Sequence, residues 1–280
     1  MRARILDGAT GTELERRGVA CELPLWSARA LLGAPEVLRA VHRDYAAAGA
    51  QALTANTFRT QRRTLARAGL GERAAELTAR AVQLAREGAR EAGAPNVFVL
   101  GSAAPLEDCY SPTLVPDDAT LAREHAEHAR NLVAAGIDAI LVETMNTARE
   151  AEAALRAAHD AGARALVSFT CAPGARLLSG EPLTAAIARV LPLSPLAIGV
   201  NCAPWQTLAP CLDVLQESRM PFFAYANLGA PRADGARTNA QTPREFAAAA
   251  RRWLDAGATA LGGCCGTRPE HVAALAALLP

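Results

Sequence analysis

The sequence predicts a (β/α)8 TIM barrel of the α/β class, and three observations support it. Eight short apolar runs are separated by helical patterns, one pattern repeats between helix and strand, and polar residues close every run. A doubly wound sheet would usually have fewer strands, and the chain has no G-x-G-x-x-G fingerprint. No linker-like segment divides the 280 residues. We therefore expect one barrel domain over residues 1–280.

The repeated pattern is A-G-[A/I]-x-A-[L/I], found at residues 48–53, 135–140, 161–166 and 256–261. Each copy follows a helical stretch and precedes a short apolar run. The glycine suits the left-handed residue just past a helix end. The apolar run suits a buried strand. The repeated unit is therefore helix, glycine stop, strand.

The expected strands are the eight apolar runs. They lie near Ile5–Asp7, Ala52–Ala55, Val97–Gly101, Ala139–Glu143, Leu166–Thr170, Ile198–Asn201, Phe222–Ala226 and Ala260–Gly263.

Helix starts can be placed at three positions between these strands. Apolar residues of the stretch 121–135 share one helical face, and Asp117 and Asp118 suit its N-cap or first turn. Pro243 and Pro269 suit the first positions of two later helices.

Composition excludes several classes of protein. All 29 basic residues are arginine, so chemistry that needs a lysine amine, such as Schiff-base aldolases, pyridoxal-phosphate enzymes and Walker-A NTPases, is ruled out. The formal net charge of +1 argues against nucleic-acid and anionic-membrane partners. No signal-like or membrane-spanning apolar run is present, so we expect a cytoplasmic protein. There, the seven cysteines should be free thiols or metal ligands.

Every expected strand ends in polar residues. In a (β/α)8 barrel these positions meet at the carboxyl end of the strands, where active sites lie. Single residues of this kind could be caps or turn formers, but eight in succession favour a functional site. They are Asp7, Asn56, Thr57, Ser102, Glu143, Thr170, Cys171, Asn201, Cys202, Asn227, Cys264 and Cys265.

Cysteines provide the strongest chemical indication. Cys202 ends the sixth strand, and Cys264 and Cys265 end the eighth between glycines that allow the backbone to bend. Three thiolates suggest Zn²⁺ with an open fourth position. Buried, unliganded cysteines are the plainer alternative. A purely structural zinc site would need a fourth protein ligand, for which Cys171 is a candidate.

A zinc ion with three thiolates suits one task in particular. It can hold an incoming thiol as its thiolate, which is a minor species of a free thiol at neutral pH. The electron-rich sulfur ligands should leave the bound sulfur nucleophilic. The expected chemistry is alkyl transfer to a substrate sulfur.

Four motifs, at residues 7–14, 54–58, 199–202 and 263–271, resemble the homocysteine S-methyltransferase family. That family includes S-methylmethionine-dependent enzymes, betaine–homocysteine methyltransferase and the homocysteine module of cobalamin-dependent methionine synthase. The resemblance implies a zinc-bearing barrel that methylates homocysteine to methionine. It also implies that Cys202, Cys264 and Cys265 bind the zinc.

The same resemblance assigns substrate residues. Asp7 and Glu143 would surround the homocysteine amino group, which is sensible for two carboxylates opposite an ammonium. Gly8 and Thr57 would lie near the substrate carboxylate, and Asn227 would shape the pocket. Local turn hydrogen bonds are the alternative role for Thr57 and Asn227.

The methyl donor is less defined, because the loop at residues 101–110 departs from the pattern of many sulfonium-using members. We expect S-methylmethionine or S-adenosylmethionine. A separate corrinoid protein as donor, another thiol or selenol as acceptor, and a non-catalytic zinc barrel are the alternatives. Arg59 could meet a donor carboxylate, but a solvated side chain is the favoured interpretation.

Overall fold

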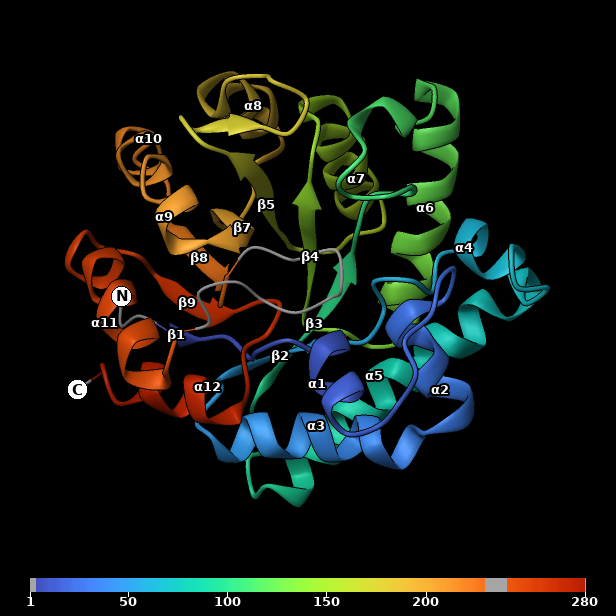
Figure 1. The fold of residues 1–280 in the computed structure, drawn as a ribbon. Helices are drawn as coiled ribbons and strands as arrows, with labels where there is room; N and C mark the ends of the chain where they lie inside the picture. The colour runs from blue at the N-terminus through green and yellow to red at the C-terminus, as the bar shows by residue number, and fades with distance from the viewer. Residues whose placement is uncertain (1–3, 230–240, 280) are drawn as a thin grey trace.

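The structure is a computed structural model that describes residues 4–229 and 241–279. Its parallel strands form one sheet in the order β1-β9-β8-β7-β5-β4-β3-β2, with a short β6 antiparallel to β5. A bridge between Leu6 and Ala52 joins the two ends of this order, so the sheet closes into a barrel surrounded by helices (Figure 1). The predicted (β/α)8 architecture is confirmed.

Most strand bounds agree with the expected runs to within a few residues. These strands are β1 (Arg4–Ile5), β2 (Ala52–Ala55), β3 (Phe98–Ala103), β4 (Ala139–Met145), β5 (Ala165–Ala172), β7 (Ile198–Pro204), β8 (Phe222–Asn227) and β9 (Ala260–Gly263). The short strand β6 (Arg176–Leu177) was not expected from the sequence. Ser102, expected just after the third strand, lies inside β3.

Helices of the described residues form the outer layer. They are α1 (Gly11–Arg16), α2 (Ala30–Gly33), α3 (Pro35–Ala47), α4 (Arg62–Ala66), α5 (Ala74–Glu91), α6 (Asp118–Ala134), α7 (Ala148–Asp160), α8 (Leu183–Val190), α9 (Trp205–Leu208), α10 (Cys211–Glu217), α11 (Pro243–Asp255) and α12 (Pro269–Ala276).

Local signals in the sequence account for the ends of these helices. The Asp117 side chain accepts a hydrogen bond from the Thr120 N–H and caps α6 as predicted. Thr242 and Glu245 form a reciprocal capping box at the start of α11. The glycines of the repeated pattern have φ values of 98°, 80°, 77° and 95°, so each takes the predicted left-handed conformation.

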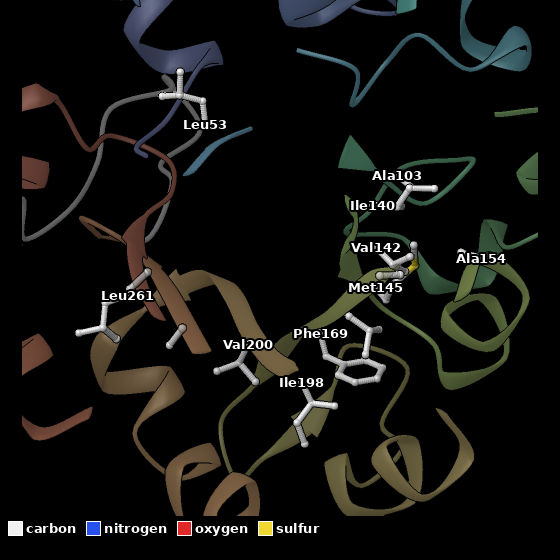
Figure 2. Close-up of a cluster of buried hydrophobic side chains, with 14 of the residues drawn as sticks. Leu53, Ala103, Ile140, Val142, Met145, Ala154, Phe169, Ile198, Val200 and Leu261 are labelled. Atoms are coloured by element: carbon white, nitrogen blue, oxygen red, sulfur yellow. The ribbon is translucent and has the colours of Figure 1, made fainter. Parts of the chain in front are cut away.

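Two apolar layers hold the barrel. Outward-facing strand residues such as Val142 and Val200 pack in the large core that also includes Ala154 of α7 (Figure 2). Residues from strands around the barrel, including Leu100, Leu141 and Phe223, form a second cluster inside it. The ring of Phe223 stacks on that of Tyr225, with centroids 6.0 Å apart. This inner cluster lies beneath the polar strand ends and forms the floor of the site.

Close approach of α3 and α5 depends on a glycine. A Cβ atom at Gly88 of α5 would lie 2.7 Å from both the Arg39 carbonyl oxygen and the Arg43 nitrogen of α3. These are backbone atoms, so relief requires the helices to separate. We therefore expect Gly88→Ala to lower the free energy of unfolding by about 1–3 kcal/mol despite the better helix propensity of alanine.

Chemical denaturation measures this effect, and Gly33 at the end of α2 provides the matched control. Nothing lies within 4 Å of a Cβ at Gly33, so Gly33→Ala should be neutral or stabilising by up to about 1 kcal/mol. Equal effects of the two substitutions would show that α3 and α5 can separate freely.

Candidate active site

Cys202 lies at an irregular end of β7. The ladder with β8 shifts register between Asn201 and Pro204, and Cys202 itself has φ 59°. Left-handed backbone is unfavourable for a residue with a side chain, so this conformation must be held by its surroundings. The bend breaks the alternation of the strand. It directs the Cys202 sulfur towards the end of β9.

Cys264 and Cys265 follow β9 in a tight turn. The Cys264 N–H donates to the Ala226 carbonyl at 2.8 Å, and the Leu228 N–H donates to the Cys265 carbonyl at 3.1 Å, which fixes the turn to β8. Gly266 has φ 88°. A Cβ at Gly263 would lie 2.4 Å from the Thr267 hydroxyl oxygen, so only glycine fits there. The turn places both cysteines beside Cys202.

Together the three cysteines make a group suited to a metal ion. Their sulfur atoms all lie within 4.8 Å of one another, and those of Cys202 and Cys265 are 3.9 Å apart. Tetrahedral coordination with zinc–sulfur bonds of about 2.3 Å requires sulfur separations of roughly 3.8 Å. The sequence-predicted ligands are therefore brought together in an arrangement that fits a thiophilic metal.

The fourth cysteine considered from the sequence is elsewhere. Cys171 lies outside the group, buried, and its thiol is hydrogen-bonded to that of Cys211. That hydrogen bond, together with burial, raises the pKa of Cys171 far above its usual range. A closed structural site with Cys171 as fourth ligand therefore does not hold.

Thiol ionisation in the cluster is unfavourable without a metal. Hydrogen bonds from Cys264 to Cys202 and Cys265, followed by burial, hold the pKa of Cys264 well above its ordinary range. Metal binding must therefore displace protons from the cluster, and metal affinity should fall as the pH falls.

Tyr110 supplies a contact to this cluster that the sequence did not reveal. Its hydroxyl oxygen lies 3.0 Å from the Cys202 sulfur. Tyr110 belongs to the loop after β3, whose sequence departs from the pattern of many sulfonium-using members of the family. Nothing in its residue type predicts a reach across the barrel mouth.

Asp7 follows β1 and faces the same cavity. Its carboxylate accepts hydrogen bonds from the Thr54 N–H at 2.7 Å and the Thr54 hydroxyl at 3.1 Å. Burial raises the pKa of Asp7 to about 8, and the nearby Glu143 adds to the rise, whereas the Thr54 hydrogen bonds oppose it. Among the described residues no cation forms a salt bridge with Asp7, so once ionised its carboxylate can accept one from a ligand.

Glu143, in β4, is the second buried carboxylate. It accepts hydrogen bonds from the Ser102 hydroxyl at 2.5 Å and the Tyr225 hydroxyl at 2.8 Å. Burial raises its pKa, although these two hydrogen bonds favour the ionised form. Ser102 was predicted at the barrel mouth from its place at a strand end, whereas Tyr225 was not predicted, because an aromatic ring on a strand is equally typical of the core.

A hydrogen-bond network joins Glu143 to the strand that carries Cys202. The Tyr225 hydroxyl is 3.0 Å from that of Ser168, which donates to the Asn201 side-chain oxygen at 2.8 Å. The Asn201 amide donates to the Thr144 hydroxyl at 2.8 Å. This buried network fixes Glu143 and the residue before Cys202 in one rigid frame.

The remaining predicted residues divide into two groups. Gly8 lines the cavity, and a Cβ there would come within 2.6 Å of the Tyr45 ring. Thr57 is fully buried behind the wall, and its hydroxyl donates to the Ser102 carbonyl at 2.9 Å. Asn227 is also buried and is absent from the lining, and its side-chain oxygen has no hydrogen-bond partner among the described residues.

One cavity of about 390 Å³ unites the site. This volume is typical of small-molecule pockets. Its wall includes Asp7, Gly8, Arg59, Tyr110, Glu143, Cys202, Cys264 and Cys265. Arg59 is only 8% exposed, so the interpretation of a solvated side chain is wrong.

In the described part of the chain, no helix is long and apolar enough to cross a membrane.

Fold and site together define a barrel enzyme with a candidate thiolate metal centre beside two buried carboxylates. The family model for homocysteine S-methyltransferase matches residues 4–279, so the chain belongs to that family and is a methyltransferase.

Two relatives and one solved structure illustrate the match. Homocysteine S-methyltransferase YbgG of Bacillus subtilis is 30% identical, over 98% of this chain and 93% of its own. Methionine synthase of Mycobacterium tuberculosis is 32% identical over 99% of this chain, but over only 24% of its own. The metallated crystal structure of the homocysteine methyltransferase MmuM from Escherichia coli superposes with TM-score 0.86 and 32% identity, covering 99% and 96% of the two chains.

Removal of one sulfur should remove the metal. We expect Cys264→Ala to bind Zn²⁺ at least about a hundredfold more weakly than the wild type, because two remaining thiolates cannot complete the site. Competition with a chromophoric chelator measures the affinity. Cys171→Ala is the control, since Cys171 is buried outside the group and should leave Zn²⁺ affinity unchanged. Wild-type affinity in a folded Cys264→Ala protein would exclude the cluster as the metal site.

Proposed function

We propose that the protein transfers a methyl group from a small sulfonium donor, S-methylmethionine or S-adenosylmethionine, to homocysteine, and that Zn²⁺ on Cys202, Cys264 and Cys265 is its cofactor. One observation carries this proposal. The cavity that holds three clustered thiols also holds two buried carboxylates, so it presents a thiophilic end and an ammonium-binding end to one small amino acid.

When bound, the zinc would lower the pKa of the homocysteine thiol and keep the sulfur as a nucleophilic thiolate. Asp7 and Glu143 pair with the homocysteine ammonium and thereby orient the sulfur towards the cysteines. The backbone of Gly8 lies at the substrate carboxylate. Thr57 and Asn227 act from behind the wall: Thr57 ties β2 to the Ser102 carbonyl of β3, and Asn227 shapes the end of β8.

The bond changes balance without an added acid. The homocysteine sulfur attacks the donor methyl carbon, a new sulfur–carbon bond forms, and the sulfonium sulfur–methyl bond breaks. The bond's electron pair leaves with the donor sulfur, which becomes a neutral thioether. A thioether needs no proton to depart, so the residues of the site have only to hold the two substrates in line and exclude water.

Methionine formation tests the proposal directly. Zinc-loaded protein receives homocysteine with S-methylmethionine, S-adenosylmethionine, betaine or methyltetrahydrofolate offered separately. We expect turnover with a sulfonium donor, and loss of turnover in Cys264→Ala and in chelator-treated protein. Activity that survives zinc removal would contradict the metal role. Inactivity with every donor would redirect the assignment to a corrinoid-protein donor or to another thiol or selenol acceptor.

Asp7 should make amino-acid binding pH-dependent. Its raised pKa of about 8 means that the substrate-free enzyme must lose a proton there before it can pair with an ammonium. Methionine, the product, carries the ammonium but no ionisable thiol. We expect its Kd to fall by up to about fiftyfold from pH 6 to pH 8, as Asp7 ionises.

Calorimetric titration with methionine at pH 6, 7 and 8 measures this dependence. Asp7→Asn is the control, because it keeps the side-chain size but removes the ionisation, so its weaker binding should depend less on pH and retain only the contribution of Glu143. A wild-type Kd that is independent of pH would show that Asp7 does not ionise in this range, and unchanged affinity in Asp7→Asn would refute its ammonium-binding role.

A further inference from the structure

Arg59 is a buried cation on the cavity wall. Its side chain follows β2, is 8% exposed and lines the same cavity as the cysteine cluster. The guanidinium carbon lies 5.3 Å from the centroid of the Phe58 ring. Stacking of this kind holds the plane of a guanidinium and leaves its edge for hydrogen bonds.

That edge is poorly satisfied. One Nη atom donates to the Glu107 backbone carbonyl at 3.2 Å, whereas the buried Nε has no partner among the described residues. Burial lowers the pKa of Arg59, which is the signature of a charge taken out of water without full compensation. A buried guanidinium normally pairs with an anion.

Neighbouring carboxylates are engaged elsewhere. Glu107 pairs with Arg63 at 3.1 Å and with Arg67 at 2.6 Å. The Asp108 carboxylate accepts from the Tyr110 N–H at 3.2 Å and the Ser111 hydroxyl at 2.6 Å. Within the described residues, Arg59 therefore forms no salt bridge and keeps its charge for a ligand.

From this geometry we infer that Arg59 binds the carboxylate of the methyl donor and selects donors that carry one. The inference rests on the proposed methyl transfer. A carboxylate in the cavity would supply the charge partner that the guanidinium lacks, through charge-assisted N–H···O hydrogen bonds.

Homocysteine is less suited than the methyl donor to supply the carboxylate that Arg59 binds. Its ammonium and carboxylate share one carbon atom, so its carboxylate must stay beside Asp7 and Glu143. Those two side chains are held by Thr54, Ser102 and Tyr225 on strands β2, β3 and β8. Arg59 is held instead by Glu107 in the loop after β3, the loop from which Tyr110 reaches Cys202. A second substrate that meets the first at the sulfur cluster can reach this loop.

Two substrates that differ only in the carboxylate distinguish its contact with Arg59 from general effects of a substitution on activity. S-Methylmethionine and its carboxamide share the sulfonium and the ammonium, but only the acid carries the carboxylate. We expect the wild type to favour the acid by about tenfold to a hundredfold in kcat/KM. Arg59→Gln should abolish the preference by raising KM for the acid, with kcat and the KM for homocysteine little changed. Arg59→Lys should restore part of it.

Arg67→Gln is the matched control, because Arg67 contacts the Glu107 carboxylate outside the cavity and leaves Arg59 in place. It should keep the wild-type preference. Calorimetric binding of the acid and the carboxamide gives a second readout that does not require turnover. Equal preference in the wild type and Arg59→Gln would overturn the inference, as would a loss confined to homocysteine affinity. Failure of methyl transfer by the wild type would instead defeat the proposed function.

Discussion

Three sulfur atoms within 4.8 Å of one another are the constraint on which the mouth of this barrel depends. Neighbouring residues on a regular strand face opposite ways, so two adjacent cysteines and a third from another strand can meet only where the backbone departs from strand geometry. The departures are the left-handed Cys202 and the turn at Gly263 and Gly266. Thr267 secures that turn, since its hydroxyl donates to the Cys264 carbonyl at 2.7 Å and accepts from the Ala9 N–H at 3.1 Å.

The buried ionisable groups of this cavity lower the stability of the folded protein. An aspartate in an unfolded chain has a pKa of about 3.9. Asp7 has a pKa of about 8 when folded, so between these values the folded protein holds a proton that the unfolded chain has lost. Stability therefore declines as pH rises through this window. Glu143 is shifted in the same direction, and Arg59 carries the opposite charge without a salt bridge among the described residues. A ligand group of opposite charge would relieve each of these costs.

Sequence patterns predicted what has a strong local or periodic signal. Strands β2 and β9 have the expected bounds, and Cys202, Cys264 and Cys265 come together because parallel strands end at one face. The wall itself was less predictable. Thr57 follows β2 and Asn227 is the last residue of β8, as expected of site residues, yet both are buried behind the cavity wall. Alternation along a strand decides which side a residue faces, and it is lost where strands end in bends.

Other residues of the site lack any pattern that could reveal them. Tyr110 reaches Cys202 because the loop after β3 crosses the mouth, and loop paths follow from tertiary contacts. The residue type and strand position of Tyr225 are typical of the core, and its ring does stack on Phe223. Its hydroxyl, however, donates a hydrogen bond to Glu143 in the site. Arginine is usually exposed, so burial of Arg59 could not be foreseen from its type.

Asp7 lies at the closure of the barrel. Strand β1 is short, and the ring closes beside Asp7 through the bridge between Leu6 and Ala52. The Asp7 carbonyl accepts from the Gly263 N–H at 3.0 Å, and its carboxylate accepts from the Thr54 N–H at 2.7 Å. One residue thus ties β1 to β9 on one side and to β2 on the other. An ammonium paired with the ionised carboxylate would favour the form that accepts the Thr54 hydrogen bonds, so a ligand that carries one would reinforce the seam. The separate hydrogen bond from the Gly263 N–H to the Asp7 carbonyl fixes the turn before Cys264, so Asp7 and the cysteine cluster belong to one connected part of the barrel.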